Sequence, residues 1–436
     1  MSHLLSRSVS WLLNGVYLLL LLIGFPWIVW SACRYGKYRG GFAEKLLGWA
    51  PRSTGSRPTL WLHAVSVGEV NLLATLVREM ASRHPDWRLV LSTTTKTGYD
   101  LARRKYADYA VFYAPLDFSW SVHTALRRVR PNLLVLAELE LWPNWIRAAR
   151  SEGVRVAVVN GRLSDSSFRG YCRIRPLVAA LLRQVNLVAA QNAEVAQRFA
   201  HLGTHPGVLQ VTGSLKYDGA VSDRNNPHTQ QLRALAHFEP ADVIWLAGST
   251  QQPEEAIVLR IFQELTDEFP RLRLVLVPRH PERFAEVAQL LAGSGLSWLR
   301  RSGMKDGQIT TTGQSPSPIV LVDTIGELGA WWGTANVGFV GGTFGSRGGQ
   351  NMIEPAAYGV ATCFGPNTRN FRDIVAQLLA AKAVEVVQDP AALAAFVRRA
   401  LEDAGWAHQL GARARQFVAS QQGATRHTIE LLEPLV

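Results

Sequence analysis

Residues 132–140 read Asn-Leu-Leu-Val-Leu-Ala-Glu-Leu-Glu, an apolar run closed by two acids. A run of apolar residues without polar alternation is typical of a strand buried on both faces of a parallel sheet. Similar runs recur along the chain, and the stretches between them are long enough for crossover helices. The sequence therefore predicts an α/β protein with doubly wound parallel sheets.

These runs fall into two series, separated by a polar segment at 219–231 that contains Asn-Pro and reads as a linker. The predicted strands are 59–65, 88–95, 110–116, 132–140, 154–161, 186–192 and 208–213, then 242–249, 271–279, 318–324, 337–342, 359–365 and 383–388. We expect two Rossmann-like domains, 34–218 and 225–420, that face each other across a cleft. Residues 421–436 are predicted to form a helix that packs back on the first domain.

The N-terminal stretch 11–30 carries no charge and has about the 20 residues that cross a bilayer as a helix. Downstream come Arg34, Lys37, Arg39 and Lys45, whereas only Arg7 precedes it. We therefore expect residues 1–33 to form a membrane anchor, with the domains on the cytoplasmic side. A cleaved signal peptide and a helix inserted in one leaflet remain alternatives.

Composition narrows the class of protein only in part. The net charge of +12 suits a polyanionic partner, which could be nucleic acid, anionic lipid or a phosphorylated substrate. The three cysteines, Cys33, Cys172 and Cys363, form neither a disulfide framework nor a zinc motif, which favours a reducing compartment. No Asp-x-Asp and no metal-ligand spacing occurs, so no metal site is predicted.

In the first domain, polar residues follow several predicted strands, where ligands of open α/β sheets bind. Glu69 should lie in the first turn of a helix, as a helix-stabilising acid or as a general base. Glu138 and Glu140, two apart, should point to one side of a strand, for chemistry or for a salt bridge to an arginine. Lys216 could neutralise a substrate charge or be a surface lysine. The loop 160–168 could bind a sugar or cap the next helix.

The second domain offers candidates for a phosphate site. Arg279, after a strong strand, could grip phosphate with its planar guanidinium. Asp323 and Glu327 could serve a ligand or cap a helix. The stretch 340–355 runs from a strand into glycines, and we expect a helix to begin near Gly349 with free N–H groups for phosphate. It matches neither a dinucleotide-binding nor a Walker motif.

The motifs together resemble those of 3-deoxy-manno-octulosonic acid (Kdo) transferases. The matching strings are HAVSVGEV, STTTKTGYD, YAPLD, ELELWPN, NGRLSDSSFRGY, GSLKYD, GST with EE, LVPRHPERF, DTIGEL and GGTFGSRGGQNMIEPAAYG. They occur in family order and cover almost the whole region after the anchor. The resemblance implies a GT-B glycosyltransferase at the inner membrane that moves Kdo from CMP-Kdo to a lipid A precursor of the tetraacyl lipid IVA type, with inversion and without a metal ion.

By the same resemblance, Glu69 is the catalytic base, and Glu138 with Lys216 stabilises the transition state. The implied CMP-binding residues are Pro278, Arg279, Ile325, Gly326, Glu327, Asn351, Met352, Ile353 and Glu354. The implied partners are CMP-Kdo, the lipid A precursor and anionic lipids of the inner membrane, with no nucleic acid and no cofactor. Two alternatives remain: a GT-B transferase that uses a UDP-sugar, and a non-catalytic membrane-bound binding protein on that fold.

Overall fold

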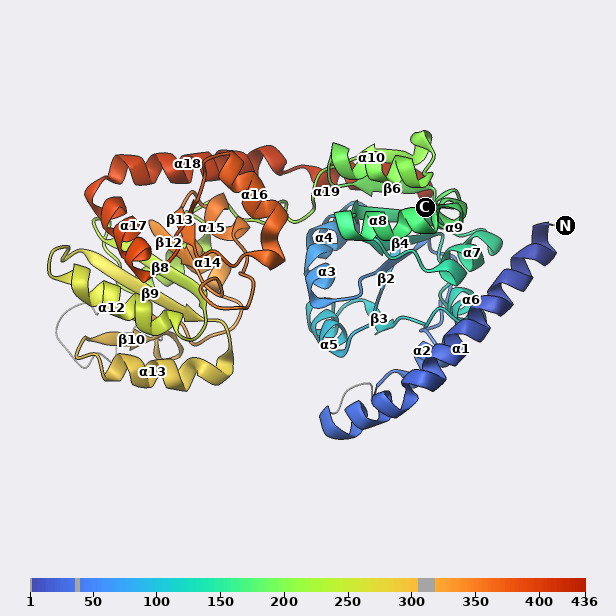
Figure 1. Ribbon diagram of the computed structural model, residues 1–436, viewed down its shortest axis with the longest axis horizontal. Helices are drawn as coiled ribbons and strands as arrows, with labels where there is room; N and C mark the ends of the chain where they lie inside the picture. Colours follow the sequence, from blue (N-terminus) through green and yellow to red (C-terminus); the bar gives the residue numbers. More distant parts are fainter. Residues whose placement is uncertain (1, 36–39, 305–317) are drawn as a thin grey trace. The chain divides into compact units, whose positions relative to one another are not determined.

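The computed structural model describes residues 2–35, 40–304 and 318–436, which form two compact units (Figure 1). Unit 1 comprises Met1–Gly219 and Gln421–Val436, and unit 2 comprises Ala220–Ser420. The chain therefore builds most of unit 1, then all of unit 2, and ends in unit 1.

Unit 1 contains a seven-stranded sheet in the order β3-β2-β1-β4-β5-β6-β7. The pairings between neighbours are parallel. The strands are β1 (Thr59–His63), β2 (Arg88–Thr93), β3 (Ala110–Tyr113), β4 (Leu133–Ala137), β5 (Arg155–Gly161), β6 (Leu187–Ala190) and β7 (Leu209–Val211). Each coincides with a predicted strand, and the predicted bounds are one to three residues too long at the carboxyl ends of most.

Helices cover both faces of this sheet (Figure 1). They are α2 (Phe42–Leu47), α3 (Val67–Leu72), α4 (Ala74–Arg83), α5 (Lys96–Lys105), α6 (Ser119–Val129), α7 (Pro143–Ser151), α8 (Asp165–Arg173), α9 (Arg175–Leu182), α10 (Ala193–Leu202) and α19 (Ala424–Leu432). Strand β4 shows why its residues are all apolar. Leu134 and Leu136 join one hydrophobic core, and Leu133 and Val135 join the core on the opposite face.

The C-terminal segment is built into unit 1. Ala424, Ile429 and Leu432 of α19 lie in the core that also contains β1 and β4 residues. Asp218 accepts hydrogen bonds from the backbone N–H groups of Gly423, at 2.7 Å, and of Thr425. The carboxylate thus satisfies N–H groups at the start of α19 that have no partner within the helix.

Unit 2 contains a second seven-stranded parallel sheet, in the order β10-β11-β9-β8-β12-β13-β14. The strands are β8 (Val243–Thr250), β9 (Leu272–Pro278), β10 (Trp298–Arg300), β11 (Ile319–Leu321), β12 (Val337–Val340), β13 (Ala361–Phe364) and β14 (Glu385–Val386). Six of them match predicted strands. Sequence analysis missed β10, because three partly exposed residues at a sheet edge carry no apolar run.

The helices of unit 2 are α11 (Pro227–Leu235), α12 (Glu254–Thr266), α13 (Phe284–Ala292), α14 (Leu328–Trp332), α15 (Ile353–Ala357), α16 (Arg372–Ala380), α17 (Pro390–Glu402) and α18 (Ala404–Gln421). Short 3-10 helices occur in unit 2 at η2 (Pro281–Arg283), η3 (Arg301–Gly303) and η4 (Arg369–Phe371). Unit 1 has two more, η1 (Pro206–Val208) and η5 (Glu433–Leu435). The predicted fold class, with two Rossmann-like parallel-sheet domains, is confirmed.

The linker predicted at 219–231 is wrong over 227–231, because α11 begins at Pro227. Asn226 accepts a hydrogen bond from the Thr229 N–H at 2.9 Å, and Pro227 occupies the first helical position. The Asn-Pro pair therefore starts a helix here, since proline at that position lacks only an N–H that would have no partner.

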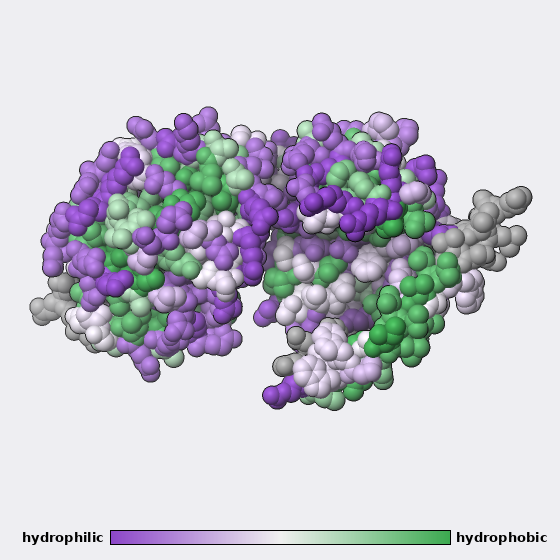
Figure 2. Space-filling model, in the orientation of Figure 1, coloured by the Kyte–Doolittle hydropathy of each residue, from purple (hydrophilic) through white to green (hydrophobic). Residues whose placement is uncertain are grey.

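Helix α1 (Ser2–Tyr35) belongs to unit 1 and includes one stretch, Ser10–Arg34, that is long and apolar enough to cross a membrane. A signal sequence would pass the same test. Figure 2 shows a strongly hydrophobic surface along this helix. The basic residues Lys37 and Arg39, used to predict orientation, lie outside the described residues, as does the side chain of Arg7.

Candidate functional site

Glu69 lies in α3, directly after β1, where the sequence places it. Its carboxylate accepts hydrogen bonds from the Val65 N–H at 2.8 Å and from the Ser66 hydroxyl at 3.0 Å. A glutamate that reaches back over the start of its own helix forms half of a capping box. Burial raises the pKa of Glu69, and the charge of Glu138 adds to the increase. The structural and functional interpretations are therefore compatible.

Glu138 follows β4, which ends at Ala137, and has a left-handed backbone with φ +59°. The expectation that Glu138 and Glu140 share one side of a strand is wrong, because both lie beyond the last ladder residue. A salt bridge to an arginine was one alternative for these acids, and the structure pairs Glu138 with a lysine: Glu138 Oε1 lies 3.7 Å from Lys216 Nζ. Two residues that sequence analysis paired are thus an ion pair in unit 1.

Glu140 is a neighbouring carboxylate that sequence analysis considered together with Glu138 but that the family resemblance did not include among the catalytic residues. Its Oε2 accepts a hydrogen bond from the Trp142 indole N–H at 2.7 Å. Burial raises the pKa of Glu140 to about 7, with further increases from the charges of Glu69 and Glu138. In the sequence, only the spacing of the two acids at 138 and 140 pointed to Glu140 as a site residue. The structure adds that both carboxylates interact electrostatically with Glu69.

A buried asparagine holds the segment that carries Lys216. Asn160, at the end of β5, has φ +53° and is fully buried. Its Oδ1 accepts hydrogen bonds from the Leu215 N–H at 3.0 Å and the Ser214 hydroxyl at 3.2 Å. The ends of β1 and β4 and the segment after β7 thereby bring Glu69, Glu138 and Lys216 to the carboxyl edge of one sheet.

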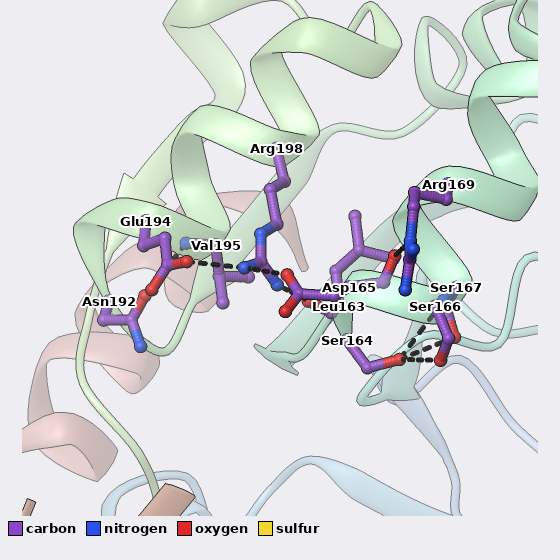
Figure 3. Close-up of polar contacts among 10 residues, drawn as sticks. All are labelled: Leu163, Ser164, Asp165, Ser166, Ser167, Arg169, Asn192, Glu194, Val195 and Arg198. Atoms are coloured by element: carbon purple, nitrogen blue, oxygen red, sulfur yellow. Dashed lines mark hydrogen bonds and ion pairs between the residues drawn. The ribbon is translucent and has the colours of Figure 1, made fainter.

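The rest of the loop 160–168 has a structural role (Figure 3). Ser164 caps α8 by accepting from the Ser167 N–H at 3.3 Å. Arg198 lies 2.5 Å from Asp165 Oδ1 and donates to Glu194 and to the Leu163 carbonyl, also at 2.5 Å. The capping interpretation of this loop is confirmed, and Arg198 fixes its position against α10.

In unit 2, Arg279 directly follows β9 and is exposed, with its N–H bound to the Thr250 carbonyl at 3.0 Å. Asn351 Nδ2 donates to Glu354 Oε1 at 3.0 Å, and Asn351 Oδ1 accepts from the Ile353 N–H at 3.0 Å. Burial raises the pKa of Glu354, while Asn351 and the charge of Arg279 oppose the increase. Arg279, Asn351 and Glu354 therefore form one electrostatic group.

The segment 323–327 is held by the neighbouring arginines. Burial favours the neutral form of Glu327, but hydrogen bonds from Thr324 and Arg301 outweigh it, so the pKa of Glu327 is lowered. Arg301 donates twice to this carboxylate, at 2.9 and 2.8 Å. The capping interpretation of Asp323 is wrong, since its carboxylate accepts from the Ser302 N–H and hydroxyl at 2.8 and 2.6 Å.

Between these groups, Gly326 has φ +93°, and Ile325 is 80% exposed. Three other predicted residues, Pro278, Met352 and Ile353, are buried, so their contribution to a ligand site is limited to shape and backbone atoms.

The glycine-rich loop differs from the expectation in two ways. Helix α15 begins at Ile353 and not near Gly349. The N–H groups at the start of the loop are also already bound: Glu254 accepts from Gly342, Thr343 and Phe344, at 2.7, 2.9 and 3.1 Å. A buried carboxylate from α12 thus binds the first N–H groups of the loop, and the N–H of Gly349, where the sequence predicted a phosphate-binding helix start, bonds to the Gly342 carbonyl at 2.9 Å.

Within the described ranges, no group of three or more histidine, cysteine, aspartate or glutamate residues could hold a metal ion.

Comparison with known proteins decides the family. A family model described as 3-deoxy-D-manno-octulosonic-acid transferase (kdotransferase) matches residues 39–219. A 3-deoxy-D-manno-octulosonic acid transferase of Haemophilus influenzae is 32% identical over 403 residues, which cover 91% of this chain and 92% of that protein. The chain belongs to the Kdo transferase family. The resemblance found in its motifs is confirmed.

Other comparisons agree with this assignment. A Kdo transferase of Bordetella pertussis is also 32% identical, over 94% of this chain and 92% of its own length. Among solved structures, a UDP-GlcNAc 2-epimerase of Neisseria meningitidis has a TM-score of 0.58 at 11% identity and covers 86% of this chain and 100% of its own. A putative UDP-N-acetylglucosamine 2-epimerase of Listeria monocytogenes has a TM-score of 0.57 at 12% identity, over 87% and 96%. At such identities, these neighbours show the GT-B fold alone.

This member of the Kdo transferase family is therefore a glycosyltransferase enzyme, and Kdo transfer in lipopolysaccharide synthesis is the activity of its family. The alternative of a non-catalytic binding protein is set aside.

Proposed function

We propose that this Kdo transferase moves Kdo from CMP-Kdo to a sugar hydroxyl of a lipid A precursor of the tetraacyl lipid IVA type, with inversion and without a metal ion. The observation that carries the proposal is the group at the edge of the unit 1 sheet, where Glu69 interacts with Glu138 and Glu138 pairs with Lys216 at 3.7 Å. In this proposal residues 34–218 bind the acceptor and residues 225–420 bind the donor.

Glu69 is the proposed general base. Its carboxylate accepts the proton of the acceptor hydroxyl while that oxygen attacks the anomeric carbon of Kdo. The bond from this carbon to the CMP phosphate oxygen breaks on the opposite face, and CMP leaves with the electron pair, which inverts the configuration. The raised pKa of Glu69 supports this role, because a base is most effective when its pKa approaches the working pH.

Glu138 and Lys216 are the proposed electrostatic pair. The ammonium group of Lys216 stabilises negative charge that develops in the transition state, and Glu138 holds it in place. Asn160 supports this arrangement, because it accepts from the Ser214 hydroxyl and the Leu215 N–H and so holds the two residues that precede Lys216.

The CMP site is proposed in unit 2. The exposed guanidinium of Arg279 binds the phosphate, and the Asn351–Glu354 pair accepts and donates hydrogen bonds to the ribose. Ile325 and Gly326 contact the base, Glu327 keeps their segment fixed through Arg301, and Pro278, Met352 and Ile353 shape the site. Because the donor carries a single phosphate, a cationic side chain is a sufficient partner for it, and no metal ion or other cofactor is needed.

We further propose that α1 attaches the enzyme to the inner membrane with both units on the cytoplasmic side. There the basic protein meets anionic lipids and a diphosphorylated glycolipid acceptor. The net charge of +12 supports this setting. The proposed partners are thus CMP-Kdo, the lipid A precursor and the membrane, and not nucleic acid.

The test is incubation of the full chain in detergent with CMP-Kdo, the tetraacyl precursor and EDTA, followed by mass analysis of the lipid product. Addition of one or more Kdo masses in EDTA is the expected result, and no product should form when a UDP-sugar replaces CMP-Kdo. Product that disappears with EDTA and returns with a divalent ion would overturn the metal-independent step. Transfer from the UDP-sugar alone would overturn the donor.

A further inference from the structure

Between Ser10 and Ala32, the hydroxyl and amide side chains of α1 fall on one stripe of the helix. Between Ser10 and Ala32, the less exposed positions recur every three or four residues. They are Ser10, Leu13, Asn14, Tyr17, Leu21, Gly24, Ile28, Ser31 and Ala32. Every hydroxyl and amide side chain of that interval lies on this stripe, which we call the docked stripe. A surface helix of a water-soluble protein has the opposite pattern, with its apolar face inward.

Hydrogen bonds of Asn14 and Tyr17 show which part of unit 1 the docked stripe packs against. Asn14 is 2% exposed, donates to the Ser119 hydroxyl at 2.7 Å and accepts from the Ser119 N–H at 3.0 Å. The Tyr17 hydroxyl donates to Asp117 Oδ2 at 2.9 Å. These bonds attach α1 to the start of α6, so α1 is a packed element of unit 1.

Asp117 connects this attachment to the rest of the unit. Its carboxylate also accepts from the backbone N–H groups of Asn144 and Trp145, at 3.1 and 2.9 Å, at the start of α7. Burial raises the pKa of Asp117 to about 6, while Asn144, Tyr17 and Trp145 oppose the increase. Loss of a partner for such buried groups costs about 1–3 kcal/mol each, which favours the docked helix.

Between Trp11 and Trp30, the outward face of α1 is apolar (Figure 2). Its exposed large side chains are Trp11, Leu12, Val16, Leu18, Leu19, Leu20, Leu22, Ile23, Phe25, Trp27, Val29 and Trp30. A protein partner usually meets a surface with a polar rim and hydrogen-bonding groups. This face instead has the aliphatic centre and tryptophan-rich ends that suit a lipid leaflet.

An aromatic series continues this surface onto unit 1. The Tyr17 ring meets Phe118 edge-on with centroids 6.1 Å apart, and Phe118 stacks on Trp120 at 4.5 Å. The Trp120 indole N–H donates to the Leu46 carbonyl of α2 at 2.9 Å. Around this point Phe42, Leu47, Trp49 and Trp120 are exposed by 58, 46, 58 and 41%.

We propose that α1 lies in the plane of one lipid leaflet, docked on unit 1, and that the same leaflet receives α2 together with Trp49 and Trp120. The docked stripe covers 22 residue steps, about 33 Å at the α-helical rise of ~1.5 Å, close to the ~30 Å thickness of a bilayer core. A spanning α1 would have to bring the polar groups of α6 and α7 into the lipid or break their bonds to Asn14 and Tyr17. The proposal rests on membrane attachment through α1, but not on the donor or the acceptor.

The test is a depth measurement with single cysteines that carry an environment-sensitive fluorophore. Cys33 and Cys172 are replaced by serine, and Cys363 is fully buried and stays. The probes are Leu12→Cys, Leu20→Cys and Val29→Cys on α1, Leu47→Cys on α2, and Leu379→Cys on α16 of unit 2 as the control. The full chain is reconstituted in phosphatidylethanolamine–phosphatidylglycerol vesicles that contain lipids with a quencher at a shallow or a deep position.

In-plane binding should give the three α1 probes the same ratio of shallow to deep quenching. The probe at 47 should also be quenched, whereas the probe at 379 should not. A much deeper position at 20 than at 12 and 29 would show that α1 spans the bilayer and would overturn the proposal. Equal and negligible quenching at 47 and 379 would show that α2 does not contact the membrane and would overturn that part of the proposal.

A second variant tests the attachment. Asn14→Leu combined with Tyr17→Phe removes the hydrogen bonds of the docked stripe, and Leu21→Ile is the matched control on the same stripe. The double variant should move the probe at 20 to a deeper position, and the control should not. An unchanged depth in the double variant would show that these bonds do not hold α1 in the plane. None of these readouts uses CMP-Kdo, so they stand apart from the test of the proposed reaction.

Discussion

Three carboxylates, Glu69, Glu138 and Glu140, lie close enough at one sheet edge to affect one another's ionisation. Lys216 places a positive charge against this group through its ion pair with Glu138. Like charges in a partly buried site raise the pKa of their neighbours, and this matches the requirement of a general base. The chemistry proposed for unit 1 therefore depends on the group and not on Glu69 alone.

Replacement of the proposed base gives the first prediction. Glu69→Gln should lower kcat/KM by about 10²–10⁴-fold, because the amide cannot accept the proton of the acceptor hydroxyl. The amide oxygen can still accept a hydrogen bond from Val65 or Ser66, so the melting temperature should change little. Product formation and thermal unfolding are measured side by side. The exposed Asp86, changed to Asn, is the control, and full activity in Glu69→Gln would contradict the role.

The pH dependence gives the second prediction. Glu69 must be charged to act, so activity is present above its pKa and is lost as the pH falls through it. Since that pKa is raised, the acidic limb of log kcat/KM should lie above pH 4.5. Glu138→Gln removes a charge that raises the pKa of Glu69 and frees the positive Lys216, so the limb should move to lower pH. Asp86→Asn should leave it in place, and a shift to higher pH in Glu138→Gln would refute the coupling.

Sequence analysis could place Glu69 because it comes three residues after Ser66, which follows a predicted strand. That spacing puts the glutamate in the first turn of the next helix. It could not foresee that Glu138 leaves the strand in a left-handed conformation, since that depends on how β4 and β5 end together. The Glu138–Lys216 contact joins residues 78 positions apart, and no local pattern reports such a contact. The family resemblance paired them, whereas spacing alone did not.

At the scale of elements, the sheets were predictable and the loops were not. Thirteen of the fourteen strands were visible as apolar runs, because burial on both faces leaves a mark on each residue. The glycine-rich loop after β12 misled the prediction: α15 begins at Ile353 and not near Gly349, and Glu254, from a helix almost ninety residues earlier, binds the N–H groups of Gly342, Thr343 and Phe344. A pattern read locally cannot show that a distant side chain already fills an anion site.

This loop gives the third prediction. Glu254→Gln should destabilise unit 2 by about 1–3 kcal/mol, because an amide offers one acceptor oxygen where the carboxylate serves four N–H groups, including that of Gln251. The KM for CMP-Kdo should also rise, since the loop leads to Asn351. Denaturant unfolding and donor titration provide the two measurements. Glu264→Gln, on the exposed face of the same helix α12, is the control and should match the parent enzyme; equal stability of both variants would contradict the assignment.

At the scale of the whole molecule, unit 1 is completed by the two ends of the chain. Helix α1, at the start of the chain, packs on unit 1. Helix α19, which follows unit 2 in the chain, contributes side chains to the core of unit 1. Asp218 joins the last residues before unit 2 to the first residues after it, through Gly423 and Thr425. The stability of unit 1 therefore depends on residues from both sides of unit 2.

The fourth prediction follows from this connection. Asp218→Ala should destabilise unit 1 by about 0.5–2 kcal/mol, the usual cost of losing a helix cap. Removal of residues 424–436 should be far more severe, because Ala424, Ile429 and Leu432 leave a hole in the core. Limited proteolysis reports which unit opens first. Cleavage should begin in unit 1, whereas the exposed Asp108→Ala control should resist as the parent does; first cleavage within unit 2 would argue against this account.

The late position of α19 has a consequence for synthesis. Residues 424–436 leave the ribosome only after all of unit 2, so the first unit to be made is the last that can finish folding. Until then, the part of the unit 1 core to which α19 contributes stays open, although α1 has already left the exit tunnel. A nascent chain that is stalled or cut short should therefore carry a finished second unit beside an open first one, and quality-control proteases should recognise it there.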